Sequence, residues 1–109
     1  MSGRSSRVKG ASAEREAFAL LNSLLMREAF KRNLSQTRAG GYDHEPLSAP
    51  VAVEVKRCET LALGKWMKQA EEQAPGLTPA VMYRRNKEPW SVLVKMTPEQ
   101  FSLWLDWQL

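Results

Sequence analysis

The sequence predicts an α/β fold in which helices pack on a mixed β-sheet. Apolar residues recur at helical spacing in separate segments, and one valine-rich segment alternates as a strand does. Pro and Gly residues separate these segments. The 109 residues, 43% of them hydrophobic, suffice for one small core and one domain. The expected order of elements is helix, three strands, helix, two strands, helix (αβββαββα).

The first predicted helix has Ser12 as its N-terminal cap and continues through residues 15–30. Phe18, Leu21 and Leu25 fall on one stripe of this helix, because residues three and four apart are neighbours on a helix surface. We expect this stripe to face the sheet.

The middle of the chain is predicted to form the sheet. Residues 33–45 are expected to make two short strands around a Gly-Gly turn, and residues 51–56 the central strand. Residues 63–74 are expected to form the second helix, which a Pro-Gly pair ends. Residues 80–83 and 90–94 are predicted to be two further strands.

The last predicted helix has a clear start signal. Thr97 is a cap residue, Pro98 stands at the first helical position and Gln100 at the third, which is a capping-box arrangement. Trp104 and Trp107 are three apart and therefore share a face of this helix. Core packing is the favoured role for both, a dimer contact the second, and base stacking the third.

Positive charge concentrates at the N-terminal end of the chain. Residues 1–38 carry eight basic and three acidic residues, a net +5, whereas the rest carries eight basic and nine acidic residues, a net −1. We expect residues 1–10 to form a basic flexible arm and residues 11–109 the folded domain. The charge favours a polyanion, nucleic acid before an anionic membrane, although a solvated tail would carry it too. The candidate nucleic-acid contacts are Arg4, Arg7, Lys9, Arg84 and Arg85.

The first residues are polar and basic with no apolar segment behind them, so we expect no secretory signal. No apolar run reaches about 20 residues, so we expect no membrane span. The single cysteine, Cys58, excludes an internal disulfide framework and fits a cytoplasmic location. With one cysteine and one histidine, a zinc site built from sulfur and nitrogen ligands is not expected.

The central predicted strand, residues 51–56, carries the candidate chemistry. Alternation places Glu54 and Lys56 on one face, about 6.5–7 Å apart, and Asp43 lies just upstream. Asp43 and Glu54 offer the hard oxygen ligands that Mg²⁺ or Mn²⁺ prefers, and the Val55 carbonyl between the two polar side chains would add another. Lys56 would orient or deprotonate an attacking water and offset charge on a phosphate.

Glu14 is a further candidate because it extends the apolar stripe of the first helix. Such a carboxylate needs a partner, which a metal ion or a nearby arginine would supply. Glu16 lies about 200° further round and should face water. Simpler interpretations exist for each acid: an exposed ion pair of Glu54, a turn role for Asp43, and a favourable charge at a helix N-terminus for Glu14. Their occurrence together, in this order, favours a site.

At motif level, about half of the chain resembles the PD-(D/E)xK nuclease superfamily. Gly41-Tyr42-Asp43 followed by Glu54-Val55-Lys56 resembles its signature, with Tyr42 in place of the usual proline. Residues 9–16, which read Lys-Gly-Ala-Ser-Ala-Glu-Arg-Glu, look like the opening of the archaeal-type Holliday-junction resolvases. More loosely, residues 66–70 and 80–84 are similar to small phage nucleases of the VRR type.

The resemblance implies a restriction-endonuclease-like fold and a dimeric, Mg²⁺-dependent endonuclease, with Mn²⁺ as a substitute, that cuts branched DNA. A four-way junction is the favoured substrate, and other flapped or nicked DNA is the alternative. From a different class, the alternative is a non-catalytic nucleic-acid-binding module on the same fold.

The resemblance also implies roles for individual residues. Asp43 and Glu54 would hold the metal, and Glu14 would complete its shell. Lys56 would act on the nucleophilic water, and Gln69 would steady the site from the second helix. The phosphate contacts that it implies are those of Arg15 and Arg38.

Overall fold

The computed structural model describes residues 3–33, 43–47 and 49–108, with side chains from residue 10 onwards. The elements in chain order are α1 (Gly3–Leu25), β1 (Val51–Arg57), α3 (Leu63–Gln73), β2 (Thr78–Arg84), β3 (Ser91–Val94) and α4 (Pro98–Gln108). The described sheet has the order β1-β2-β3, in which β2 pairs in parallel with β1 and antiparallel with β3. The predicted α/β class and mixed sheet are therefore confirmed.

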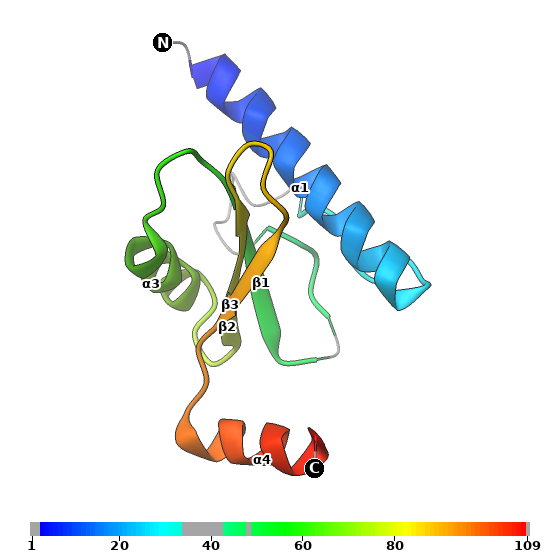
Figure 1. Cartoon of the computed structure of the whole chain (residues 1–109), viewed down its shortest axis with the longest axis vertical. Helices are drawn as coiled ribbons and strands as arrows, with labels where there is room; N and C mark the ends of the chain where they lie inside the picture. Colours follow the sequence, from blue (N-terminus) through cyan, green and yellow to red (C-terminus); the bar gives the residue numbers. More distant parts are fainter. Residues whose placement is uncertain (1–2, 34–42, 48, 109) are drawn as a thin grey trace.

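Two helices cover opposite faces of the sheet (Figure 1). Because side chains alternate along a strand, each face receives every second residue. The core under α1 consists of Ala13, Ala17, Phe18, Val53, Val55, Ala80 and Met82. On the other face, Val81 of β2 packs against Trp66 and Met67 of α3. The sheet is thus the middle of three layers.

The helix α1 begins earlier than predicted. It starts at Gly3, so the expected cap Ser12 lies inside the helix. Residues 3–10, expected to form a separate flexible arm, are the first turns of α1. They contain no proline, and extending a helix whose later turns are packed adds one hydrogen bond per residue, which offsets the low helix propensity of Gly10.

The same helix also ends earlier than predicted, at Leu25. Met26 adopts the left-handed conformation, with φ of 59°. The Arg27 N–H donates to the Asn22 carbonyl and the Met26 N–H to the Ser23 carbonyl, both at 3.2 Å. This pair of hydrogen bonds is a Schellman motif, which satisfies carbonyls at the end of a helix.

The Asn22 side chain then reverses the chain direction. Its Oδ1 accepts hydrogen bonds from the N–H groups of Ala29 (2.9 Å) and Phe30 (2.8 Å), and its Nδ2 donates to the Phe30 carbonyl (3.0 Å). The reversal brings the Phe30 ring onto that of Phe18, with centroids 5.8 Å apart. The chain leaving α1 therefore returns to the core.

The flanks of the predicted 33–45 hairpin pair antiparallel. The Asn33 N–H donates to the Asp43 carbonyl and the Glu45 N–H to the Lys31 carbonyl, each at 2.8 Å. In the described residues this pairing is an isolated bridge between Arg32 and His44, and the two predicted short strands stay a prediction. Residues 34–42, with most of the predicted hairpin, lie outside the described residues.

The second half of the chain follows the prediction closely. The helix α3 ends before Pro75-Gly76, and Gly76 has a φ of 85°, which favours glycine. The capping box of α4 is confirmed: the Thr97 N–H donates to Gln100 Oε1 at 2.9 Å, and the Gln100 N–H donates to Thr97 Oγ1 at 3.1 Å.

The packing of α4 was predicted wrongly. None of its residues is buried, and Trp104 and Trp107 are exposed by 45% and 82%. Figure 1 shows α4 standing away from the layered part of the domain. The capping signals specify that a helix forms here, but they do not specify what its apolar side chains contact.

The reversal after α1 can be tested with Asn22→Ala. Because the substitution leaves the N–H groups of Ala29 and Phe30 without their acceptor, we expect the free energy of unfolding to fall by about 2 kcal/mol. Urea unfolding followed by circular dichroism measures this. Ser23→Ala, a change at an exposed neighbour, is the control and should have little effect. An equal loss in both variants would contradict the role of Asn22.

Candidate functional site

Six of the predicted site residues line one cleft of about 540 Å³. They come from α1, from the segment before β1, from β1 and from α3. These residues are Glu14, Asp43, Glu54, Val55, Lys56 and Gln69. The tertiary structure therefore brings together the acids, the lysine and the glutamine that the sequence motifs selected.

Two side chains complete the outer edge of β1. This strand is at the edge of the described sheet, so its backbone groups that point away from β2 need other partners. The Val55 N–H donates to Asp43 Oδ2 at 2.6 Å, and the Val53 N–H donates to His44 Nε2 at 3.0 Å. Asp43 is thereby held against the Glu54–Val55 backbone.

His44 is fully buried and has a structural role. Its Nδ1 lies 2.7 Å from the Glu45 carbonyl, which fixes Nδ1–H as the donor and leaves Nε2 as the acceptor for Val53. Burial lowers the pKa of His44, against the opposing effects of the Glu45 carbonyl and the Asp43 charge. The sequence analysis missed this role, although a histidine beside the candidate acid and ahead of the strand was a signal.

Glu54 is an acid in an unfavourable environment. It is 2% exposed, and burial together with the neighbouring negative charge of Asp43 raises its pKa to about 7. Lys56 opposes this shift, while Glu14 adds to it. A cation in the cleft would stabilise the ionised form of Glu54.

Glu14 has an arginine as its partner. The Arg32 Nε donates to Glu14 Oε1 at 2.8 Å. Burial raises the pKa of Glu14, and the hydrogen bond from Arg32 opposes that shift. Of the two partners that the sequence left open, the structure contains the arginine, and a contact of Glu14 with a metal ion stays a prediction.

Glu16 does not simply face water, as was predicted. Its carboxylate accepts hydrogen bonds from Arg84 Nε (2.8 Å), Trp90 Nε1 (3.0 Å) and Arg57 Nη1 (3.3 Å). The hydrogen bond from Arg84 is the main reason why the pKa of Glu16 is lowered. The Arg84 guanidinium also lies 5.4 Å from the centre of the Trp90 ring. These contacts join α1 to both strands of the parallel pair, so Arg84 has a structural role whether or not it also contacts DNA.

Two of the other predicted phosphate contacts, Arg15 and Arg85, do not line the cleft. Arg15 borders a separate hollow beside Phe18 and Asn22, and Arg85 is exposed in the turn before β3. The side chains of Arg4, Arg7 and Lys9, and the whole of Arg38, lie outside the described residues.

The cleft residues fit a magnesium ion in their donor chemistry. In the described ranges, no three His, Cys, Asp or Glu side chains form a ready-made metal cluster. Mg²⁺, however, is usually bound by one or two carboxylates together with water and substrate phosphate. Asp43 and Glu54 supply two carboxylates. Because the N–H and C=O of a strand residue point to the same edge, the Val55 carbonyl lies on the side of Asp43.

No protein-family model, curated protein or solved structure matches this chain. The fold and the cleft themselves define an α/β domain with buried acids and a lysine at the edge of a mixed sheet. None of the helices that the structure describes has the length and apolar character needed to span a bilayer.

The raised pKa of Glu54 predicts a pH-dependent stability. Because the pKa of Glu54 is about 7 in the folded protein and its ordinary value is 4.5, the folded protein retains a proton that the unfolded chain loses between these two pH values. In the presence of a chelator, the stability that the proton on Glu54 contributes is fully present below about pH 4.5. It is lost as the pH rises through 7.

We therefore expect Glu54→Gln to gain about 3 kcal/mol relative to the wild type between pH 4.5 and 8. Urea unfolding of both proteins across this pH range measures the difference between their free energies of unfolding. Both proteins contain His44, so the contribution of this residue largely cancels in the difference. Glu72→Gln, on the exposed side of α3, is the control. A difference that does not change with pH would contradict the environment described for Glu54.

Proposed function

We propose that this protein is a metal-dependent endonuclease that cuts branched DNA, on a restriction-endonuclease-like fold of the PD-(D/E)xK superfamily. The observation that carries the proposal is the single cleft lined by Asp43, Glu54 and Lys56. Acid, acid and lysine in this order are what the motif requires. The resemblance of residues 9–16 to Holliday-junction resolvases favours a four-way junction as the substrate.

In this proposal, the Asp43 and Glu54 carboxylates and the Val55 carbonyl hold a Mg²⁺ ion. When bound, the ion supplies Lewis-acid activation of a phosphate oxygen and of water. Lys56 shares a strand face with Glu54, where it orients the attacking water and offsets negative charge that develops on the phosphate. Gln69 lines the same cleft from α3 and positions the groups around Lys56.

A second hollow supports a polyanionic substrate. It has a volume of about 520 Å³ and adjoins the cleft through Lys56 and Gln69, which line both. Lys65 and Lys68 of α3 add two exposed positive charges to it. Lysines that follow a groove make the sequence-independent phosphate contacts needed to recognise DNA by shape. The sequence analysis did not select this pair, although two lysines three apart on the helix after the motif were a signal.

A non-catalytic nucleic-acid-binding module is the second candidate. The pairing of Glu14 with Arg32 favours it, because this ion pair engages an acid that the resemblance assigns to the metal shell. The two candidates differ in cleavage but share DNA binding, so one experiment separates them.

Cleavage is tested with a labelled four-way junction and a linear duplex of the same sequence, in Mg²⁺ and in EDTA. We expect nicking of the junction in Mg²⁺ only, and a loss of at least about a hundredfold in Lys56→Ala. Lys31→Ala removes an exposed lysine outside the cleft and should retain the wild-type rate. Binding without cleavage would support the non-catalytic module, and full activity of Lys56→Ala would contradict the assigned mechanism.

Metal binding is tested separately from activity by thermal unfolding in Mn²⁺. Because a ligand that binds only the folded state stabilises it, a concentration 100 times Kd should add about 2.7 kcal/mol to the wild type. Asp43→Asn should remove most of this gain, whereas Glu59→Gln, also at the cleft, should keep it. An equal gain in all three proteins would locate the ion elsewhere.

A further inference from the structure

The outer edge of β3 presents backbone groups with which no other described strand pairs. In the sheet order β1-β2-β3, this strand has a neighbour on one side only. The Lys95 N–H, directly after β3, donates to the Pro79 carbonyl of β2 at 3.1 Å. Because the N–H and C=O groups of successive strand residues point to opposite edges, those of Val92 and Val94 point away from β2. The edge therefore carries two donors and two acceptors in the pattern of a β-ladder.

The two edges of the described sheet differ in how they are completed. At the β1 edge, the side chains of Asp43 and His44 accept the outward N–H groups of Val55 and Val53. At the β3 edge, residues 91–94 read Ser-Val-Leu-Val and all four are exposed. Natural proteins usually protect such an edge with a charged residue, a proline or a bulge, or by keeping the strand short. Apart from its short length, β3 has none of these features, so its edge is open to a further strand.

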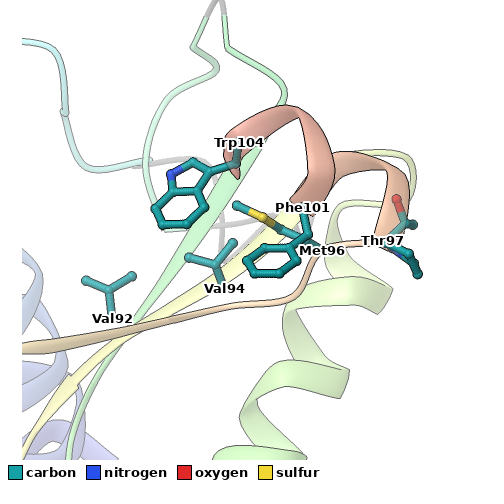
Figure 2. Close-up of a pocket in the computed structure, with 7 residues that line it drawn as sticks. Val92, Val94, Met96, Thr97, Phe101 and Trp104 are labelled. Atoms are coloured by element: carbon teal, nitrogen blue, oxygen red, sulfur yellow. The ribbon is translucent and has the colours of Figure 1, made fainter. Parts of the chain in front are cut away.

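An apolar hollow adjoins this edge. It has a volume of about 620 Å³ and lies between β3 and α4, and we call it the β3–α4 hollow (Figure 2). Val92 and Val94, which line it from β3, are exposed by 54% and 40%. In the figure they face the same space as the rings of Phe101 and Trp104, which stack with centroids 5.9 Å apart. The rest of the lining consists of Met96, Thr97 and Pro98.

The edge and the hollow together define the chemistry of an occupant. An extended polypeptide offers N–H and C=O groups at the spacing of a strand, which nucleic acid and lipid do not. A strand added here lies about 4.8 Å from β3, and every second side chain of it stands on the side of the hollow. A hollow of this volume accommodates large apolar side chains. The fitting occupant is an extended segment in which two such residues are separated by one other.

A second copy of this chain fits less well. Among the described strands, β1 has its outer edge occupied and β2 is central, so a copy offers only its own β3. On the side of the hollow, that strand carries only the short side chains of Val92 and Val94. These would leave most of the β3–α4 hollow unfilled. A segment of a different protein, with aromatic or long aliphatic residues, fills it better.

The charges of α4 favour a basic residue at one end of this segment. The helix carries Glu99 and Asp106 and no basic residue. Both acids lie on the side of the helix away from Phe101, but a helix is only about 10 Å across, which is close to the Debye length. Nearby Lys95 is paired with Glu71 at 2.6 Å and so offsets little of this negative charge.

We propose that β3 and the β3–α4 hollow bind an extended segment of a different protein, which adds an antiparallel strand beside β3. Its backbone pairs with Val92 and Val94, its large apolar side chains enter the hollow against Phe101 and Trp104, and its basic end lies next to α4. The strands β3 and β1 are at opposite edges of the described sheet, so the segment leaves the cleft at β1 open. The proposal does not rest on nuclease activity, and its test contains no DNA.

The test measures binding of a fluorescein-labelled peptide to the full chain by fluorescence anisotropy. The peptide has two lysines followed by alternating phenylalanine and threonine, and we expect saturable binding. N-methylation of the phenylalanine amides, which face β3 in antiparallel pairing, should raise the dissociation constant at least about tenfold. Methylation of the threonine amides, which face away, should have little effect. Glutamates in place of the lysines should raise the dissociation constant about threefold at low salt.

Three variants locate the site on the protein. Trp104→Ala removes one wall of the hollow and should weaken binding at least about tenfold. Val92→Pro removes an outward N–H but no hydrogen bond to β2, and it should weaken binding similarly. Leu103→Ala, at a 72% exposed position of α4 that does not line the hollow, is the control and should bind as the wild type does. Circular dichroism checks that each variant is folded.

Two results would overturn the proposal without depending on any variant. Absence of binding to the wild type at millimolar peptide would show that the edge accepts no strand. Equal affinities of the two methylated peptides would show that backbone pairing with β3 does not contribute. Sedimentation velocity adds a third: a wild-type dimer that Val92→Pro dissociates and the peptide does not would make a second copy the occupant.

Discussion

The hydrogen bond from the Val55 N–H to the Asp43 carboxylate is the contact on which the cleft depends. It works together with the bond from the Val53 N–H to His44, because both complete the outer edge of β1 with side chains. An unpaired buried N–H costs a free energy similar to that of a lost hydrogen bond. The outer edge of β1 therefore holds the segment that carries Asp43 in place. The position of this acid follows because the backbone N–H groups of β1 require hydrogen-bond acceptors.

This segment is in turn held by the turn after α1. Asn22 redirects the chain at Ala29 and Phe30, and the following residues pair with the backbone on either side of His44. Phe30 also contacts His44 edge-on, with centroids 5.1 Å apart. The end of α1, which is far from Asp43 in sequence, thus controls the position of this acid in the cleft.

Glu16 and Glu54 differ in how the protein stabilises their negative charge. Glu16 accepts hydrogen bonds from three donors, two of them arginines, and joins the helix to the sheet. Glu54 is more deeply buried and has negative neighbours, so its ionised form is disfavoured. Strongly perturbed acids of this second kind are concentrated at functional sites, where stability is reduced in exchange for chemistry. The contrast supports a structural role for Glu16 and a functional one for Glu54.

The sequence by itself determined most of the local structure. The alternation around Glu54 predicted β1, the Pro-Gly pair predicted the end of α3, and Thr97 with Gln100 predicted the cap of α4, because each of these signals acts between residues close in the chain. Spacing and motif order also selected the residues that line the cleft.

Only the tertiary structure decided which partners these residues have. Arg32 pairs with Glu14, His44 caps a strand edge, Arg84 binds Glu16, and Trp107 remains exposed. Helical or strand periodicity shows which side of an element is apolar or charged, but not which distant segment meets that side. That choice depends on how the whole chain satisfies its buried backbone groups and covers its apolar surface.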